Sequence, residues 1–282
     1  PTAYDPSAIT LTITPWFHVM GLVGNFCSFT TGRTIVYLPK FDMQTYLMCI
    51  EKYKVPQLAV VPPILVALCK LDIKFDLSSV KTIYSGAAPL HKDTLEVLKT
   101  KFPATQILQG YGMTEVTLAV TRDTMETAHL AKPGGVGFIC AGTIIKIVDP
   151  ETRKTLGPNQ RGELCVRGPS VMKGYIGKDT KDDIDSEGFF KTGDIGYYDD
   201  DKYFFIVDRL KELIKYKAYQ VPPAEIEALL LQHPGVKDAG VVGVENKEAG
   251  EVPLAFVVKQ SDSDVTEDDV KKFVAERVSM TT

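Results

Sequence analysis

The stretch QILQGYGMTE, residues 106–115, runs from an apolar segment into a turn with two glycines and ends on a hydroxyl and a carboxylate. Glycines let the backbone adopt positive φ and let its N–H groups approach a ligand closely. Thr114 can donate to a phosphate oxygen, and Glu115 is a hard oxygen ligand suited to Mg²⁺. A small-residue turn is more often only a turn, so this stretch indicates a ligand site only together with others.

Strand-like and helical runs alternate before this stretch. They are residues 34–38, 44–53, 57–62, 62–71, 80–90 and 91–102. Strands separated by helical segments are typical of a mostly parallel α/β layer. QILQGYGMTE would be the last strand of this layer and would lead into its glycine turn. SGAAPL, residues 85–90, is a second small-residue turn after a strand, and its lack of bulk would let a flat ring lie against the backbone. We therefore predict an α/β layer over residues 1–120.

The pattern of predicted elements changes after residue 120. Short strand-like runs separated by Gly, Pro and Asp turns occupy residues 142–149, 161–168, 188–199 and 203–209. Such a pattern is typical of an antiparallel barrel or sandwich. We expect residues 121–208 to form a β-barrel-like region.

A third pattern begins near residue 210. Its predicted elements are a helix over 222–236, strands over 238–244 and 253–258, and a helix over 266–279. Prolines start the first helix and Pro-Gly stops it, while Thr266 and Asp269 have the spacing of a capping box at the start of the last. Residues 209–282 are predicted to be a small α+β unit, with its boundary inside 207–219.

Composition excludes several classes of protein. The chain has 32 basic and 36 acidic residues and a net charge of −4. It therefore lacks the excess of positive charge that is typical of proteins that bind nucleic acid or an anionic membrane. The longest apolar run, residues 58–69, is too short to span a bilayer and is broken by two prolines. Five cysteines without a C-x-x-C pair indicate reduced thiols in an intracellular protein.

Four kinds of candidate residue each have a functional and a structural interpretation. Asp194 could accept from two ribose hydroxyls or cap a turn, and Arg209 could bind an anion or form a surface ion pair. His18, among aromatic residues, is more often a satisfied core histidine than a functional one. Three lysines at alternating positions would share one face of an extended segment, or simply be solvated. They are Lys211, Lys215 and Lys217.

The order of the motifs is more specific than any one of them. In sequence they are PWFHVMG (15–21), YSGAAPL (84–90), QGYGMTE (109–115), RGELCVRGPSVMKGY (161–175), KTGDIG (191–196) and VDRLKELIKYKAYQVPPAEIE (207–227). This series resembles the adenylate-forming superfamily of acyl-CoA synthetases and luciferases, and it looks closest to insect luciferase-like acyl-CoA ligases and plant 4-coumarate–CoA ligases. The likeness covers essentially the whole chain.

The resemblance implies an α/β fold in which a large N-terminal domain, with a parallel α/β layer and a small β-barrel, is joined by a hinge to a small, incomplete α+β C-terminal domain. It implies a division into residues 1–208 and 209–282. The reaction would have two steps. A carboxylate attacks the α-phosphorus of ATP to give an acyl-adenylate and pyrophosphate, and the thiol of CoA then displaces AMP.

The family pattern also implies the site. Nucleotide or CoA contacts would come from Ser85, Gly86, Ala87, Ala88, Gln109, Gly110, Tyr111, Gly112, Thr114, Asp194, Arg209, Lys211, Lys215 and Lys217. Tyr111 would pack on the adenine, Thr114 would bind the α-phosphate, and Glu115 would be the Mg²⁺ ligand. Asp194 and Arg209 would bind the ribose.

Further roles implied by the family concern the acyl site and the hinge. His18 would lie at the acyl site and, with Thr114, Glu115 and Lys215, belong to the catalytic group. Asp208 to Lys211 would be the hinge between the two half-reactions. Lys211 and Lys215 would face nucleotide or phosphate, and Lys217 would face CoA.

The sequence departs from the family pattern in three places. The glycine- and hydroxyl-rich phosphate loop would lie before Pro1, and the adenylation lysine near the family's C-terminus would lie beyond Thr282, so we expect a fragment of a longer protein. Inside the chain, Ala218 stands where the family usually has glycine beside the pantetheine path. Its methyl group puts thioester formation in question more than adenylation.

The expected function is ligation of a fatty or aryl acid to CoA, with ATP, Mg²⁺ and CoA as cofactors or co-substrates. A luciferase is the alternative within the enzyme class, although the apolar Leu118 suits an alkyl chain better than a polar heteroaromatic acid. The alternative outside it is a non-catalytic nucleotide-binding scaffold. We expect a monomer without nucleic-acid partners, a role in fatty acid metabolism, and a peroxisomal or cytoplasmic location.

Overall fold

The computed structural model describes residues 7–87, 90, 92–177, 179–217, 219–261 and 263–277. The chain divides into two compact units. The first comprises residues 1–192 and 197–206, and the second comprises residues 193–196 and 207–282. The strand that contains residues 193–196 therefore contributes to both units.

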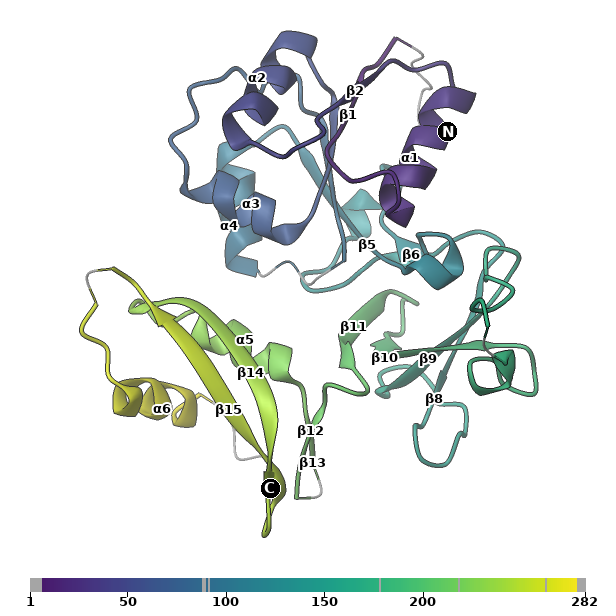
Figure 1. Cartoon of the computed structure of the whole chain (residues 1–282), viewed down its shortest axis with the longest axis vertical. Coiled ribbons are helices and arrows are strands. Elements are labelled where there is room, and N and C mark those ends of the chain that lie inside the picture. The colour runs from purple at the N-terminus through teal and green to yellow at the C-terminus, as the bar shows by residue number, and fades with distance from the viewer. Residues whose placement is uncertain are drawn as a thin grey trace. The chain divides into compact units, whose positions relative to one another are not determined.

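The first unit is built on a parallel layer that the alternation of strand-like and helical runs predicts correctly (Figure 1). Its strands are β3 (Gln57–Val60), β4 (Thr82–Ser85) and β5 (Gln106–Tyr111), and its helices are α2 (Met43–Tyr53), α3 (Pro62–Lys70) and α4 (Lys92–Lys101). The strands pair in parallel, with Ala59 opposite Tyr84 and Tyr84 opposite Leu108. Parallel strands need crossover connections, which α3 and α4 supply.

Local signals in the sequence fix the ends of these helices. Asp42 caps α2 by accepting from the backbone N–H of Thr45 at 2.8 Å, and Lys54 ends the helix in the left-handed region. Two prolines occupy the first turn of α3, where their missing N–H groups have no helical partner in any case. The ammonium group of Lys101 donates to the carbonyl of Leu68 and so helps to close the far end of α3.

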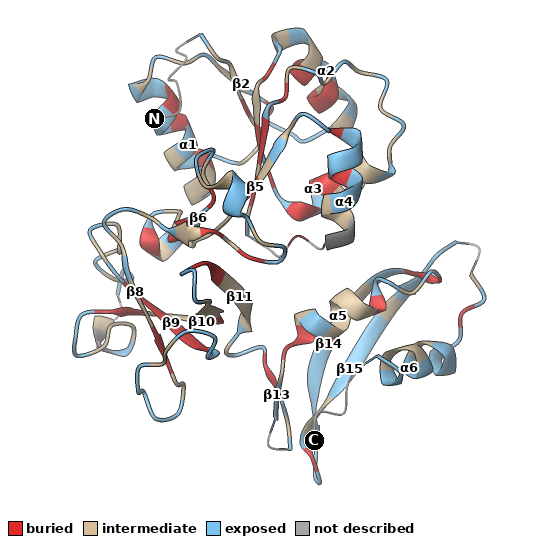
Figure 2. Cartoon of the chain, turned by 180° about the vertical axis from the view of Figure 1, so that it is seen from behind, coloured by how far each residue is buried: buried red, intermediate tan, exposed pale blue. Residues whose placement is uncertain are grey.

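The main core lies between the helices and the parallel strands, where Figure 2 shows buried residues on α2 and α3. Its fully buried large side chains are Tyr46, Leu47, Ile50, Leu58, Leu65, Leu68, Ile83 and Leu98. They alternate along the strands and recur every three or four residues along the helices, as one-sided burial requires. This apolar layer supports the ends of the strands from which the candidate site projects.

Helix α1 (Val19–Thr30) was not predicted, because its hydrophobic pattern is inverted. Its buried residues are Gly21, Asn25 and Ser28, whereas Leu22, Phe26 and Phe29 are exposed. The buried face lies against β1 (Thr10–Thr12), where Thr12 donates to Asn25 at 3.2 Å. Strand β1 pairs in parallel with β2 (Ile35–Tyr37).

Two short strands extend the parallel layer with reversed direction. Strand β5 pairs antiparallel with β6 (Thr121–Arg122), and β6 pairs antiparallel with β7 (Phe138–Ile139). The resulting five-stranded sheet has the order β3-β4-β5-β6-β7. Short 3₁₀ turns at Thr114–Val116, Ala128–Leu130 and Thr180–Asp182 accompany these segments.

The predicted barrel over residues 121–208 is observed as a four-stranded sheet. Its strands are β8 (Ile144–Val148), β9 (Gly162–Arg167), β10 (Phe190–Tyr198) and β11 (Phe204–Arg209). Their order is β11-β10-β9-β8, so β11 and β8 are its edges among the described residues. Two backbone hydrogen bonds join Phe204 of edge strand β11 to Val136 and Gly137, which satisfies this edge without closing the sheet into a barrel.

The second unit is α+β, as predicted. Its sheet has the order β13-β12-β15-β14, and its elements are β12 (Ile214–Tyr216), β13 (Tyr219–Val221), α5 (Pro223–Leu230), β14 (Val236–Asn246), β15 (Gly250–Lys259) and α6 (Glu267–Ala275). Thr266 and Asp269 form the predicted capping box at the start of α6. None of the helices in the described part of the chain is long and apolar enough to cross a membrane.

Helix α4 offers a matched test of the core. Leu98 is fully buried, whereas the adjacent Val97 is 42% exposed. Leu98→Ala should lower the free energy of unfolding by about 3 kcal/mol, because a buried cavity is left behind. Val97→Ala should change it by about 0.5 kcal/mol or less. Urea unfolding followed by circular dichroism measures both, and equal shifts would contradict this assignment of the core.

Candidate functional site

The register between β4 and β5 brings the two small-residue turns together. Ser85 is the partner of Gln109 at the carboxyl ends of these parallel strands, and each glycine turn follows directly. Ligands of open α/β sheets bind beyond the carboxyl ends of the strands. The structure therefore places Ser85, Gly86, Gln109 and Gly110 side by side, as their positions in the sequence predict. The hydroxyl oxygen of Ser85 is buried and has no hydrogen-bond partner among the described residues.

Close contact between the two turns already requires glycine there, without any ligand. A Cβ at Gly86 would lie 3.0 Å from the carbonyl oxygen of Gly110, so the two strand ends approach closely. The space that the sequence suggests for a flat ligand is, at this position, occupied by neighbouring backbone. Ala87 adopts φ of 71°, in the left-handed region that favours glycine. The predicted site residue Ala88 lies outside the described residues.

A tight turn follows β5 and carries Thr114 and Glu115. These residues begin a 3₁₀ turn that ends with Thr117 in the left-handed region, and Leu118 follows it there with φ of 88°. The turn folds back so closely that a Cβ at Gly112 would lie 1.4 Å from the carbonyl oxygen of Leu118. Thr114 is exposed and Glu115 is half-buried, so both are accessible to a ligand.

Residues 170–175 lie along this turn and form hydrogen bonds with it. The N–H of Met172 donates to the carbonyl oxygen of Glu115 at 2.8 Å, and the hydroxyl of Thr117 donates to the carbonyl oxygen of Ser170 at 2.7 Å. The hydroxyl of Tyr175 donates to Oε1 of Glu115 at 2.7 Å. This hydrogen bond to the carboxylate is the main reason that the pKa of Tyr175 rises to about 12. The sequence assigned no role to Tyr175, although it ends the motif RGELCVRGPSVMKGY.

A buried polar pair supports β5 next to the same turn. Asp123 is almost fully buried, and its carboxylate accepts from the hydroxyl of Tyr203 at 2.9 Å and from the N–H of Gln109 at 3.2 Å. The N–H of Asp123 donates in turn to the carbonyl oxygen of Gln109 at 2.8 Å. Burial outweighs these bonds and raises the pKa of Asp123. No feature of the sequence pointed to this pair, because its partners are 80 residues apart.

Tyr111 ends β5 opposite Thr121 and is half-buried. Its side chain packs against two apolar clusters, one containing Val116 and Val166 and the other containing Leu164. Part of the ring therefore already has protein contacts, and its predicted stacking on adenine stays a prediction.

His18 is neither buried nor surrounded by the core. It is exposed at the start of α1, where its Nδ1 accepts from the N–H of Met20 at 3.1 Å. The interpretation as a satisfied core histidine is therefore wrong. Because Nδ1 accepts a hydrogen bond, the neutral imidazole carries its proton on Nε2 in this conformation.

In the second unit, Asp194 and Arg209 lie close together. Nε of Arg209 is 3.8 Å from Oδ1 of Asp194, and the N–H of Leu210 donates to the carbonyl oxygen of Gly193 at 2.7 Å. Asp194 is nearly buried within β10. The guanidinium of Arg209 is 72% exposed and also lies 3.6 Å from Glu212, in agreement with the surface ion-pair interpretation.

The alternating positions of the three lysines would place them on one face if the whole segment were extended. In the structure the segment is not extended throughout. Lys211 lies in a turn where the carbonyl oxygen of Arg209 accepts from two later N–H groups. Lys215 is in β12, and Lys217 leaves that strand in a hairpin turn with φ of 53°. The turns at both ends break the alternation. All three side chains are exposed, and Ala218 lies outside the described residues.

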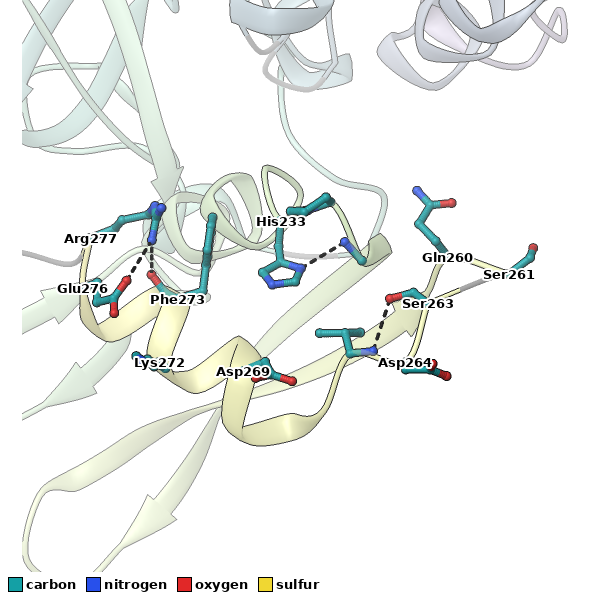
Figure 3. Close-up of a pocket in the computed structure, with 13 residues that line it drawn as sticks. His233, Gln260, Ser261, Ser263, Asp264, Asp269, Lys272, Phe273, Glu276 and Arg277 are labelled. Atoms are coloured by element: carbon teal, nitrogen blue, oxygen red, sulfur yellow. Dashed lines mark hydrogen bonds and ion pairs between the residues drawn. The ribbon is translucent and has the colours of Figure 1, made fainter.

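A surface pocket of about 890 Å³ lies in the second unit and involves none of the predicted site residues. It is formed by the segment after α5, the end of β15 and helix α6 (Figure 3). Nδ1 of His233 accepts from the N–H of Gly235, and its ring meets Phe273 edge-on at 4.9 Å. The charges of Asp264, Asp269, Glu276, Lys272 and Arg277 largely balance there. The pocket thus favours no class of charged ligand.

The described residues contain no group of three or more His, Cys, Asp or Glu side chains that could hold a metal ion by themselves. Glu115 offers one accessible carboxylate. Mg²⁺ commonly binds through one or two carboxylates together with substrate phosphates and water, so a single carboxylate fits such a shared site. A metal held entirely by protein ligands does not fit.

Two family models match separate parts of the chain. A family model described as AMP-binding enzyme matches residues 2–176, and one described as AMP-binding enzyme C-terminal domain matches residues 225–280. The chain is 47% identical to 4-coumarate–CoA ligase 1 of Petroselinum crispum and 45% identical to luciferin 4-monooxygenase of Nipponoluciola cruciata. These matches cover 96% and 98% of this chain and 51% and 50% of the relatives. The chain thus spans about half the length of the curated relatives it matches.

A solved structure shows the same fold. O-succinylbenzoate coenzyme A synthetase from Bacillus subtilis, in complex with ATP and magnesium ion, matches with a TM-score of 0.87 and 30% identity. The match covers 99% of this chain and 57% of that enzyme.

Gly112→Ala tests the tight turn after β5. The added methyl would overlap the carbonyl of Leu118, so the turn must open, and the free energy of unfolding should fall by about 3 kcal/mol. Gly157→Ala is the control, because a Cβ there meets nothing within 4 Å. Thermal unfolding of both variants measures the difference. A Gly112→Ala variant as stable as the control would show that the turn is not held as described.

Asp123→Asn tests the buried carboxyl group through pH. The pKa of Asp123 is raised in the folded state, so the unfolded chain ionises first as pH rises from ~4. As pH rises from about 4 to the raised pKa of Asp123, the free energy of unfolding of the parent protein should therefore fall relative to that of the variant. Urea unfolding of both proteins at several pH values measures this change. A difference that is constant with pH, or that moves the other way, would contradict the assignment.

Proposed function

Because the chain belongs to the AMP-binding enzyme family, we propose that the protein is an ATP-dependent acid–CoA ligase resembling 4-coumarate–CoA ligase. A carboxylate oxygen of the acid bonds to the α-phosphorus of ATP as the bond to pyrophosphate breaks. The sulfur of CoA then bonds to the acyl carbon as AMP leaves.

The observation that carries this proposal is the geometry at the ends of β4 and β5. Two small-residue turns lie side by side there, and the second continues into the accessible Thr114 and Glu115. Backbone N–H groups, a hydroxyl and a carboxylate near one strand end suit a phosphate-bearing ligand with a bound cation.

In this proposal Thr114 binds the α-phosphate, Tyr111 packs on the adenine, and Glu115 is the protein ligand of Mg²⁺. The bound Mg²⁺ would supply charge neutralisation for the phosphates. Ser85 and Gly86 line the same side of the nucleotide. His18, with its Nε2 proton outside the capping hydrogen bond, would contact the acid.

The family pattern assigns the remaining contacts to Asp194, Arg209 and the lysines within residues 211–217. Asp194, nearly buried in β10, would accept from the ribose hydroxyls, and Arg209 beside it at 3.8 Å would assist. We propose that the domain division lies at residues 208 and 209, and that the hinge lies within residues 208–211. The exposed Lys215 and Lys217 would face phosphate and CoA.

The class of acid is part of the proposal. An aryl acid is supported by the 47% identity to a 4-coumarate–CoA ligase, and a fatty acid is the alternative suggested by the apolar Leu118. The predicted peroxisomal or cytoplasmic location and the monomeric state stay predictions.

A luciferase is the second candidate, because the identity to a luciferin 4-monooxygenase is 45%, almost the same as to the ligases. Both candidates share adenylation and differ in the fate of the adenylate. Luminescence on addition of ATP, Mg²⁺, luciferin and oxygen would favour the luciferase. Formation of an acyl-CoA thioester without light would favour the ligase.

Glu115→Gln tests the metal assignment. The change keeps the shape of the side chain and removes its charge, so acid-dependent exchange of labelled pyrophosphate into ATP by the complete gene product should fall about 10²-fold or more. The exchange is measured across a magnesium titration. Glu151→Gln, in an exposed loop, is the control. An unchanged rate in Glu115→Gln at every magnesium concentration would remove Glu115 from the site.

A further inference from the structure

Glu115 is held at both ends by one neighbouring segment. The N–H of Met172 binds its carbonyl oxygen at 2.8 Å, and the hydroxyl of Tyr175 binds its Oε1 at 2.7 Å. The same segment accepts a hydrogen bond from Thr117 at Ser170. Two of these contacts tie the turn to the segment, and the third, from Tyr175, holds the carboxylate itself.

The segment is itself anchored independently of Tyr175. Met172 and Val171 pack against the apolar cluster that contains the buried residues Val116 and Val166. Tyr175, by contrast, is 40% exposed and is a member of none of the apolar clusters described for the chain. Its ring lies outside these clusters, and its hydroxyl donates to the carboxylate of Glu115.

The geometry of the carboxylate leaves room for a ligand. The hydrogen bond from Tyr175 occupies Oε1, and none of the described contacts of Glu115 involves Oε2. A side chain with three rotatable bonds would otherwise sample several orientations, and ordering it on binding would reduce affinity. Hydrogen bonds to the ligating carboxylates of metal sites orient them in this way, and their loss weakens metal affinity or activity by about 10–100-fold.

We propose that Tyr175 is a positioning residue whose hydroxyl orients the Glu115 carboxylate toward the divalent cation of a metal–nucleotide complex. The inference rests on the proposed function, which makes Glu115 a metal ligand. It adds that the segment around residues 170–175, distant in sequence, sets the metal affinity of the site.

The test replaces only the hydroxyl. Tyr175→Phe in the complete gene product should weaken binding of Mn²⁺ in the presence of ATP, followed by electron paramagnetic resonance of the free ion, by about 10-fold. Binding of AMP without metal should be unchanged, because a merely structural loss would affect it too. Tyr53→Phe, half-buried at the end of α2, is the matched control and should change neither.

A double-mutant cycle shows whether Tyr175 acts through Glu115. Tyr175→Phe should cause no further loss of Mn²⁺ affinity in a Glu115→Gln background. Unchanged or tighter Mn²⁺ binding in Tyr175→Phe alone would overturn the proposal, as would an additive loss or an equal loss of metal-free AMP binding.

The parent protein separates this inference from the proposed function. If it binds Mn²⁺ with ATP in a Tyr175-dependent way but forms no acyl-adenylate, the positioning role stands and the ligase assignment fails. If it forms adenylate and Tyr175→Phe binds Mn²⁺ normally, the assignment stands and the positioning role fails. Absence of any metal-dependent nucleotide binding by the parent would overturn both.

Discussion

The close approach of β4 and β5 at their carboxyl ends is the constraint on which the candidate site depends. Register in a sheet is set by its hydrogen-bond ladder and by the buried faces of its strands, and a slip of one residue would reverse every side chain. At the observed register, Gly86 and Gly110 approach so closely that a side chain at Gly86 would meet the backbone of β5. Small residues are thus demanded by the fold before any ligand is considered.

Contacts from distant parts of the chain hold the turn after β5. Asp123, which accepts a hydrogen bond from Tyr203, binds the backbone of Gln109, and residues 170–175 bind Glu115 and Thr117. The left-handed residues Thr117 and Leu118 are unfavourable locally and persist because these contacts surround them. The local sequence of the turn supplies the chemical groups, while tertiary contacts supply their orientation.

This difference between local sequence and tertiary contacts explains how much of the structure the sequence could predict. Periodicity and capping predicted the elements from β2 to α4 and the capping box of α6, because these signals are local. Periodicity missed α1, whose polar residues face inward. It also could not show that turns interrupt the segment of Lys211, Lys215 and Lys217, which are all exposed, as the solvated interpretation expects. The roles of Asp123 and Tyr175 depend on partners 80 and 60 residues away, which no local pattern reveals.

The contacts of the proposed hinge show which bonds a reorientation at each position would break. The N–H of Leu210 donates to Gly193 at 2.7 Å, which ties Arg209 to the strand of Asp194. The carboxylate of Asp208 accepts from the N–H of Ala224 at 3.2 Å, which ties the same segment to the first turn of α5. A pivot before Leu210 must break the shorter bond and separate Arg209 from Asp194. A pivot at Lys211 keeps that bond and the proposed ribose-binding pair intact. It breaks the bond between Asp208 and Ala224 and the two bonds that the N–H groups of Glu212 and Leu213 donate to the carbonyl oxygen of Arg209, each worth about 1 kcal/mol.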